Sequence, residues 1–292
     1  MAGKLRAVKR RISSVQSTQK ITRAMELIAS ARIMKAQRRV EAARPYADEM
    51  RNLMASVAKN ASNIDHPLLQ QKETINTVGL IVIAGDRGLA GAYNSNVIRA
   101  AERNVRDIDN VRLFLSGKKA ISYFRFRGYD VSDSWTGYSD QPKIANARAV
   151  AKAATDAFSA GDVDEVRLAY TKFESALTQR PVLVNLLPIP RSEFEEEEDT
   201  GPRANYVFEP EPEDILSYLL PRYVEGAVLQ GMLEAAASEH AARRRAMKAA
   251  TDNANELIDS LTRAYNQARQ AEITTEIMEV VGGAEALAAA EK

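Results

Sequence analysis

The sequence predicts an α/β protein in which the N- and C-terminal helices form a long antiparallel coiled coil. A doubly wound α/β domain is inserted between the two helices in the sequence. Two observations lead to this fold class. Both ends of the chain carry apolar residues at heptad spacing, and the middle alternates between strand-like and helix-like segments. The expected domains are a coiled-coil helix over residues 1–62, the α/β domain over 72–209 and a second coiled-coil helix over 210–285.

The N-terminal helix is predicted from a heptad seam that is apolar at both ends and polar in the middle. Near Gln19 to Glu26 the apolar residues move to Ile21, Met25 and Ile28, which predicts a register shift of the stutter type. Steps of three and four residues define the seam: Leu5, Val8, Ile12, Val15, Gln19, Thr22, Glu26, Ala29, Ile33, Ala36, Val40, Ala43, Ala47, Met50, Met54 and Val57.

The C-terminal helix carries a second seam, and Gly282 and Gly283 are expected to end it. The helices would be roughly 85 and 100 Å long, beyond the roughly 35–40 Å of the domain, so their apolar stripes are expected to cover each other. No stretch as polar as residues 19–26 is expected opposite, which predicts a curved or bulged rod. The seam residues are Leu233, Ala237, His240, Arg244, Met247, Thr251, Ala254, Ile258, Leu261, Tyr265 and Ala268.

The middle of the chain alternates between two periods. Alternating strands and helices of these lengths predict a mostly parallel, Rossmann-like sheet. An acidic run over residues 193–199 is interpreted as a solvated loop. Strands are expected at residues 77–84, 111–116, 129–135, 165–173 and 182–187, and helices at residues 93–106, 118–127 and 144–159.

The composition excludes several kinds of chemistry. The chain has no cysteine and two histidines, which excludes thiol chemistry and a histidine-rich metal site. No apolar run approaches the roughly 20 residues that cross a bilayer, so membrane contact is expected only through partners. The basic first twenty residues continue the helical pattern past residue 40 and are therefore interpreted as helix, not as a transit peptide.

Charge is concentrated at the N-terminus. The whole chain has a net charge of +1, but residues 1–39 hold eleven Lys or Arg against one acid, Glu26. Like charges along one helix repel, so an acidic partner surface is expected there. Nucleic acid is not expected, because residues 1–45 contain no aromatic side chain for stacking.

The glycine-rich segment Gly85-Asp-Arg-Gly-Leu-Ala-Gly91 is the main candidate for a phosphate-binding loop. It lacks a Gly-Lys-Ser/Thr sequence and the G-x-G-x-x-G spacing, so a tight turn before a helix is the preferred interpretation. Ser116-Gly117-Lys118-Lys119 is a weaker candidate of the same kind. His240 is interpreted as a packed or interfacial seam residue. No catalytic residue, cofactor or metal is therefore expected.

Several stretches resemble the gamma subunits of bacterial F-type ATP synthases, and the resemblance covers essentially the whole chain. They are residues 17–25 (STQKITRAM), 43–46 (ARPY), 86–89 (DRGL), 222–225 (RYVE), 246–253 (AMKAATDN), 265–270 (YNQARQ) and 281–283 (VGG). The resemblance implies a central rotor shaft that couples proton-driven rotation of the c-ring to conformational cycling of the catalytic beta subunits.

The resemblance also implies a non-catalytic subunit, present once per complex at the cytoplasmic face of the plasma membrane. Its partners would be the alpha and beta subunits of the catalytic head, the epsilon subunit and the c-ring. Phe208 replaces a tyrosine common in the family. The implied contacts are Met25, Arg243, Arg269, Gln270 and Thr274 for the beta subunits, and Tyr206, Phe208 and Glu209 for a foot on the c-ring and epsilon subunit.

Two other classes of protein are also compatible with the sequence. One is an autonomous coiled-coil tether whose globular insert, residues 70–210, dimerises. The other is a nucleotide-dependent enzyme with a ligand at residues 85–91. An oligomeric insert would favour the first, and heat released on adding ATP or NAD would favour the second.

Overall fold

The structure, a computed structural model, describes residues 2–60, 66–190 and 211–290 of the 292-residue chain. Backbone contacts divide the chain into two compact units. The central unit is Ala29–Arg243, and the terminal unit combines Met1–Ile28 with Arg244–Lys292. Each unit is described by itself below.

The central unit contains a five-stranded sheet in the order β3-β2-β1-β4-β5. The first four strands are parallel, and β5 pairs antiparallel to β4, which confirms a mostly parallel sheet. A short 3-10 helix, η1, precedes the first strand. The other elements are β1 (Thr77–Ile83), α2 (Tyr93–Val105), β2 (Asn110–Ser116), α3 (Lys118–Phe126), β3 (Val131–Trp135), α4 (Ile144–Ser159), β4 (Glu165–Phe173) and β5 (Gln179–Leu187), with η1 at Pro67–Leu69.

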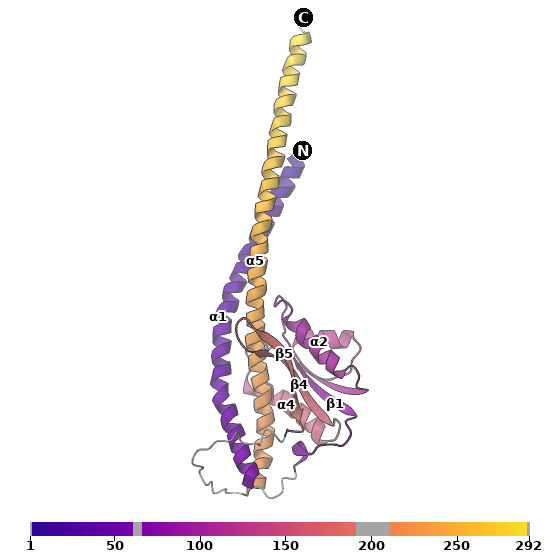
Figure 1. Ribbon diagram of the computed structural model, residues 1–292. Coiled ribbons are helices and arrows are strands. Elements are labelled where there is room, and N and C mark those ends of the chain that lie inside the picture. Colours follow the sequence, from indigo (N-terminus) through magenta and orange to yellow (C-terminus); the bar gives the residue numbers. More distant parts are fainter. Residues whose placement is uncertain (1, 61–65, 191–210, 291–292) are drawn as a thin grey trace. The chain divides into compact units, whose positions relative to one another are not determined.

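The sheet is covered on both faces because its central strand is apolar throughout. In β1, Leu80 and Val82 pack with α2 and α3, whereas Ile81 and Ile83 pack on the opposite face with α4 and α5. Successive side chains of a strand point to opposite faces, so a continuous apolar run requires a layer on each side. Figure 1 shows the helices arranged around β1, β4 and β5.

The two terminal helices are α1 (Ala2–Asn60) and α5 (Pro212–Ala290). The predicted end of α5 at Gly282 and Gly283 is wrong, since the helix continues to Ala290. Glycine in a helix interior costs only about 1 kcal/mol relative to alanine, and it ends a helix when it adopts a left-handed cap. Neither Gly282 nor Gly283 has such a positive φ.

The first turns of α5 belong to the core of the sheet. Leu216, Leu220, Val224 and Val228 are each at most 1% exposed and pack in the same cluster as Ile81. Helix α5 therefore serves as the second covering layer of the sheet before its heptad seam begins at Leu233.

Within the central unit, α1 and α5 lie side by side and antiparallel (Figure 1). Ile33, Ala36 and Val40 of α1 form one buried cluster with Leu233 and Ala237 of α5. All five are predicted seam residues, so the seam is confirmed here.

Within the terminal unit, the predicted register shift is wrong. The seam passes through the polar stretch unchanged: Thr22 Oγ1 lies 2.8 Å from Thr251 Oγ1, and the Gln19 amide donates to the Asn255 side chain. Ile21 is instead 60% exposed. Because polar seam residues find polar partners, the helices have no energetic reason to change register.

The same contacts correct the expectation that no polar stretch faces residues 19–26. Thr251 and Asn255 supply one, and each pairs with a polar residue of α1. The sequence predicts a curved or bulged rod because residues 19–26 would lack a polar stretch opposite them, and these pairs remove that reason.

Candidate functional site

Three of the residues expected to contact beta subunits lie together on the surface of α5. Arg269, Gln270 and Thr274 are all exposed. Gln270 and Thr274 are one helical turn apart and so share a face. The Thr274 hydroxyl donates to the Gln270 backbone carbonyl at 2.9 Å, as hydroxyls in helices commonly do. The three side chains are therefore accessible to a partner that contacts this part of α5.

Met25 and Arg243 are in different environments. Met25 is half-buried on α1. Arg243 is 7% exposed, and its guanidinium donates to the Gly88 carbonyl at 3.3 Å and to the Glu239 carboxylate. The structure thus gives Arg243 partners inside the chain.

The expected foot lies outside the described residues. This applies to Tyr206, Phe208 and Glu209, and also to the acidic run over residues 193–199.

The basic N-terminal block is largely exposed on α1. Two of its arginines have acidic partners within the chain: Arg23 pairs with Glu26 at 2.9 Å, and Arg32 pairs with Asp140 at 2.8 Å. Seven other basic residues of the block are exposed and keep their charges at the surface, namely Arg6, Lys9, Arg10, Arg11, Lys20, Lys35 and Arg38.

The glycine-rich turn after β1 is organised by the Asp86 carboxylate. This carboxylate accepts bonds from the backbone N–H groups of Lys118 at 3.1 Å, Gly137 at 2.8 Å and Ser139 at 3.4 Å. It therefore occupies the N-terminus of α3, where a phosphate bound by the weaker candidate, Ser116-Gly117-Lys118-Lys119, would lie. The preferred interpretation of the turn as structural is supported by these bonds.

Close packing explains why glycine occupies Gly85 and Gly117 in the two candidate loops. A Cβ on Gly85 would lie 2.9 Å from the Glu239 carboxylate. Gly117 has a φ of 101°, and a Cβ there would lie 2.1 Å from the Ala84 carbonyl oxygen. A side chain is excluded at Gly117 by the backbone itself, whereas at Gly85 it would have to displace the Glu239 carboxylate.

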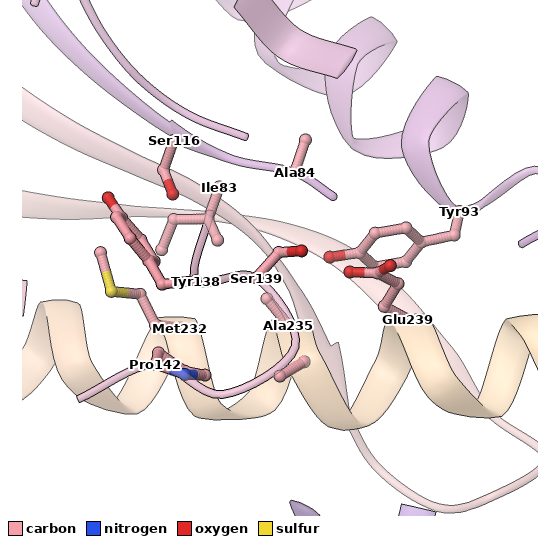
Figure 2. A pocket seen from close by; sticks show the side chains of 11 residues that line it. Ile83, Ala84, Tyr93, Ser116, Tyr138, Ser139, Pro142, Met232, Ala235 and Glu239 are labelled. Carbon is pink, nitrogen blue, oxygen red and sulfur yellow. The ribbon is translucent and has the colours of Figure 1, made fainter. Parts of the chain in front are cut away.

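The crevice beyond the carboxyl ends of the strands, where ligands bind in open α/β sheets, is filled by α5. Figure 2 shows Met232, Ala235 and Glu239 of α5 beneath the ends of the strands, with the Tyr93 hydroxyl pointing toward Glu239. The remaining cavity is about 10 Å³, room for roughly one water molecule. A nucleotide does not fit, and a carboxylate here would repel a phosphate.

Three titratable groups at or beside this cavity have shifted pKa values. Burial raises the pKa of Glu239, and the nearby Arg243 opposes that shift. Burial also raises the pKa of Tyr93 well above its usual value, and the Glu239 charge adds to it. Burial lowers the pKa of His240 to about 4, so the imidazole is neutral at pH 7.

The interpretation of His240 as a packed residue is supported, since it is 2% exposed. Its ring lies 4.0 Å from the Asp140 carboxylate. The sequence interpretation missed Asp86, Asp140 and Glu239 as a connected set. One signal was available: an aspartate directly before a glycine-rich turn is a common capping residue.

Among the described residues, no three or more His, Asp or Glu side chains gather as a metal site. Within the same parts of the chain, none of the helices combines the length and apolarity needed to span a bilayer.

Paired terminal helices with exposed polar faces, joined to an α/β domain whose ligand crevice is filled from within, define a stalk-type subunit of a larger assembly. Comparison with known proteins is consistent with this class. A family model described as ATP synthase matches residues 4–287. The chain belongs to the ATP synthase gamma chain family.

Relatives match over nearly their full length. The ATP synthase gamma chain of Frankia casuarinae is 49% identical over 296 residues, covering 99% of both chains. The gamma chain of Mycolicibacterium smegmatis is also 49% identical, over 307 residues and 99% of both chains.

Solved structures share the fold. A chain of the central stalk and c-ring structure of the Tetrahymena thermophila mitochondrial ATP synthase matches with a TM-score of 0.59 and 25% identity, covering 79% of this chain and 99% of that one. A chain from the Euglena gracilis mitochondrial enzyme has a TM-score of 0.68 at 17% identity, covering 100% and 97%.

Proposed function

We propose that this chain is the central rotor shaft of an F-type ATP synthase. It couples proton-driven rotation of the c-ring to conformational cycling of the catalytic beta subunits during ATP synthesis or hydrolysis. The observation that carries the proposal is the antiparallel seam of α1 and α5, found in a member of the gamma chain family. A seam of this kind lets one pair of helices transmit torque while its outer faces meet partners.

The chain has no active site of its own in this proposal. The crevice at the strand ends is occupied by α5, and the cavity left there is too small for a nucleotide. Titration of the isolated chain with ATP or NAD in a calorimeter should release no heat. Saturable heat that is lost on mutating Asp86 would instead favour the nucleotide-dependent enzyme.

The proposed partners are the alpha and beta subunits of the catalytic head, the epsilon subunit and the c-ring, with one copy of this chain per complex. The chain would sit at the cytoplasmic face of the plasma membrane and touch the membrane only through those partners. The exposed basic block on α1 supports an acidic surface on at least one of them.

For the beta subunits we propose contacts through five residues, namely Met25, Arg243, Arg269, Gln270 and Thr274. Exposure of the last three supports this assignment. Arg243 is 7% exposed, and within this chain its guanidinium also donates to Gly88 and Glu239. The foot on the c-ring and epsilon subunit is proposed at Tyr206, Phe208 and Glu209.

Co-purification tests the function. A tagged chain isolated from membranes should bring down two larger ATP-binding subunits in threefold excess over itself. Recovery of the chain as a homodimer without ATP-binding subunits would support the tether and overturn the shaft.

A paired substitution tests the beta contact. Replacing Arg269 and Gln270 by alanine in the whole complex should slow ATP synthesis roughly tenfold or more, because lost hydrogen bonds to a partner cost 1–2 kcal/mol or more in total. Arg263→Ala, an exposed arginine outside the proposed set, is the matched control. Equal rates for both variants would remove these residues from the contact.

A further inference from the structure

The loops that follow β1 and β3 are fixed to both long helices by one connected set of polar side chains. We call Arg32, Asp86, Asp140, Glu239 and Arg243 the polar clamp. All five belong to the central unit: Arg243 is its last residue, and Arg32 lies close to its first, Ala29.

The first part of the polar clamp joins α5 to the loop after β1. Glu239 is 1% exposed and accepts from Arg243, which in turn donates to the Gly88 carbonyl at 3.3 Å. Gly85 lets the same loop lie directly against Glu239. The Arg243–Gly88 bond is directed from α5 toward the loop, whereas the Arg243–Glu239 bond lies within α5 and orients the guanidinium; hydrogen bonds weaken steeply when they are bent.

The second part joins the two loops. Asp86 Oδ2 accepts from the backbone N–H groups of Gly137 and Ser139, while the Ser139 hydroxyl accepts from the Asp86 N–H at 3.1 Å. The two loops are therefore bonded reciprocally at Asp86 and Ser139, so neither moves without the other.

The third part returns from the second loop to the helices. Asp140 Oδ2 accepts from Arg32 of α1 at 2.8 Å and lies 3.6 Å from Arg87 of the first loop. Its other oxygen lies 4.0 Å from His240 of α5. Polar contacts therefore run from α5 through both loops to α1, and the second loop also places Asp140 close to His240 of α5.

Stability alone does not explain this arrangement. Burying charges is costly, and well-packed apolar residues often stabilise a protein as well or better. The Glu239 Oε2 and Asp140 Oδ1 atoms even lack hydrogen-bond partners among the described residues. Apolar contacts such as those of Ile33 and Ala237 are non-directional, so they resist separation more than sliding. Directional bonds resist rotation.

We propose that the polar clamp is the torsional joint between the α/β domain and the paired helices of the central unit. Its members are positioning residues that keep the domain at a fixed angle about α1 and α5 under load. The inference rests on the proposed shaft function, because only a chain that transmits torque needs such a joint.

The test measures torsional stiffness in the assembled complex. The chain has no cysteine, so Ser122→Cys on the exposed surface of α3 gives one attachment point for a bead on this chain. With the catalytic head immobilised and its nucleotide sites locked, the width of the bead's angular fluctuations reports stiffness. Asp140→Asn and Glu239→Gln should each soften the joint by up to about twofold, the limit set by charge-assisted bonds being roughly twice as strong as neutral ones.

The matched control is Asp162→Asn. Asp162 pairs with Arg112 at 2.8 Å, and this ion pair lies within the α/β domain and involves neither α1 nor α5. The bead's angular fluctuations in the Asp162→Asn variant should equal those in the unsubstituted chain. A softening as large as that of Asp140→Asn would overturn the proposal, because it would show a general loss of rigidity.

Two readouts separate the outcomes. Thermal unfolding of each variant reports stability, and a lowered Tm with unchanged angular fluctuations would overturn the clamp as a joint. If the unsubstituted chain does not assemble with ATP-binding subunits, the proposed function has failed. If complexes assemble and the clamp variants are as stiff as the control, only the clamp proposal has failed.

Discussion

The same heptad seam lies in two settings in this chain, and the settings differ in how deeply it is buried. In the central unit Ile33 and Val40 are 4% and 2% exposed. In the terminal unit Ile12 and Ile258, at equivalent seam positions, are only half-buried. Two helices cover each other along one stripe, and a third layer is needed to exclude water from the sides. The α/β domain supplies that layer in the central unit.

The two settings also differ in what their polar seam residues do. In the terminal unit Thr22 and Thr251 bond to each other across the seam. In the central unit His240 faces Asp140 of the α/β domain. Apolar burial supplies most of the free energy in the central unit, whereas paired polar residues define the register in the terminal unit.

The largest difference between the two units should appear in the free energy of unfolding when a seam isoleucine of each unit is replaced by alanine. Ile33→Ala should lower the free energy of unfolding by about 3 kcal/mol, because a nearly buried side chain leaves a cavity. Ile12→Ala should cost about 1 kcal/mol, because its site is open to water. Urea unfolding of the full chain, with hydrogen exchange to locate each effect, measures both. Equal losses would break the comparison.

The second-largest effect is expected from the pH dependence that His240 gives to the stability of the central unit. Its folded pKa of about 4 lies below the ordinary value of 6.5, so below pH 6.5 the unfolded state binds a proton more readily than the folded state. The free energy of unfolding is therefore unaffected by His240 above pH 6.5 and decreases as the pH falls toward 4. Asp140 opposes this shift, and Arg243 and Arg32 reinforce it. His240→Gln should remove on the order of 2–3 kcal/mol of pH dependence across that window.

Thermal unfolding of the wild type and His240→Gln at pH 7.5 and pH 4.5 measures the effect. The difference between the two proteins isolates His240 from the carboxylates that also titrate. A constant difference in stability across this range would mean that His240 takes up its proton in the folded state as easily as in the unfolded state.

The threonine pair of the terminal unit should give a smaller, coupled effect. Thr22→Val or Thr251→Val alone should cost about 1–2 kcal/mol, because one buried hydroxyl loses a partner. The double variant should cost less than the two together. A double-mutant cycle on unfolding free energies measures the coupling, and strict additivity would show that the hydroxyls do not interact.

The smallest effect is expected at Ile28. This residue is 54% exposed on α1. Ile28→Gln should change the free energy of unfolding by less than about 0.5 kcal/mol, as surface substitutions usually do. If the apolar side of α1 did shift to Ile28, the loss would approach that of Ile33→Ala.

Much of the α/β domain could be predicted from the sequence. Helix α4 and strand β4 have the predicted bounds, and β1 ends one residue earlier than expected. Their signals are local: an apolar run in a strand and an alanine-rich amphipathic stretch in a helix are each encoded within a dozen residues. Strand β5 begins three residues before the predicted Val182, because the antiparallel pairing with β4 extends it.

The candidate site was harder to predict. Exposure of Arg269, Gln270 and Thr274 follows from their positions off the seam, so periodicity anticipates it. Burial of Arg243 does not follow, because its partners Gly88 and Glu239 come from a distant loop and from its own helix. Sequence spacing gives the helix face, but not the loop that packs against it.

The sequence by itself determined the antiparallel pair of helices, its seam and the doubly wound sheet, because each depends on residue spacing along one segment. Only the tertiary structure decided that α5 fills the ligand crevice, that the polar seam residues are paired and that Asp86, Asp140 and Glu239 form one network. These features join residues that are tens to hundreds of positions apart. A local pattern cannot encode which distant polar group will satisfy a buried one, since that choice is made when the layers pack.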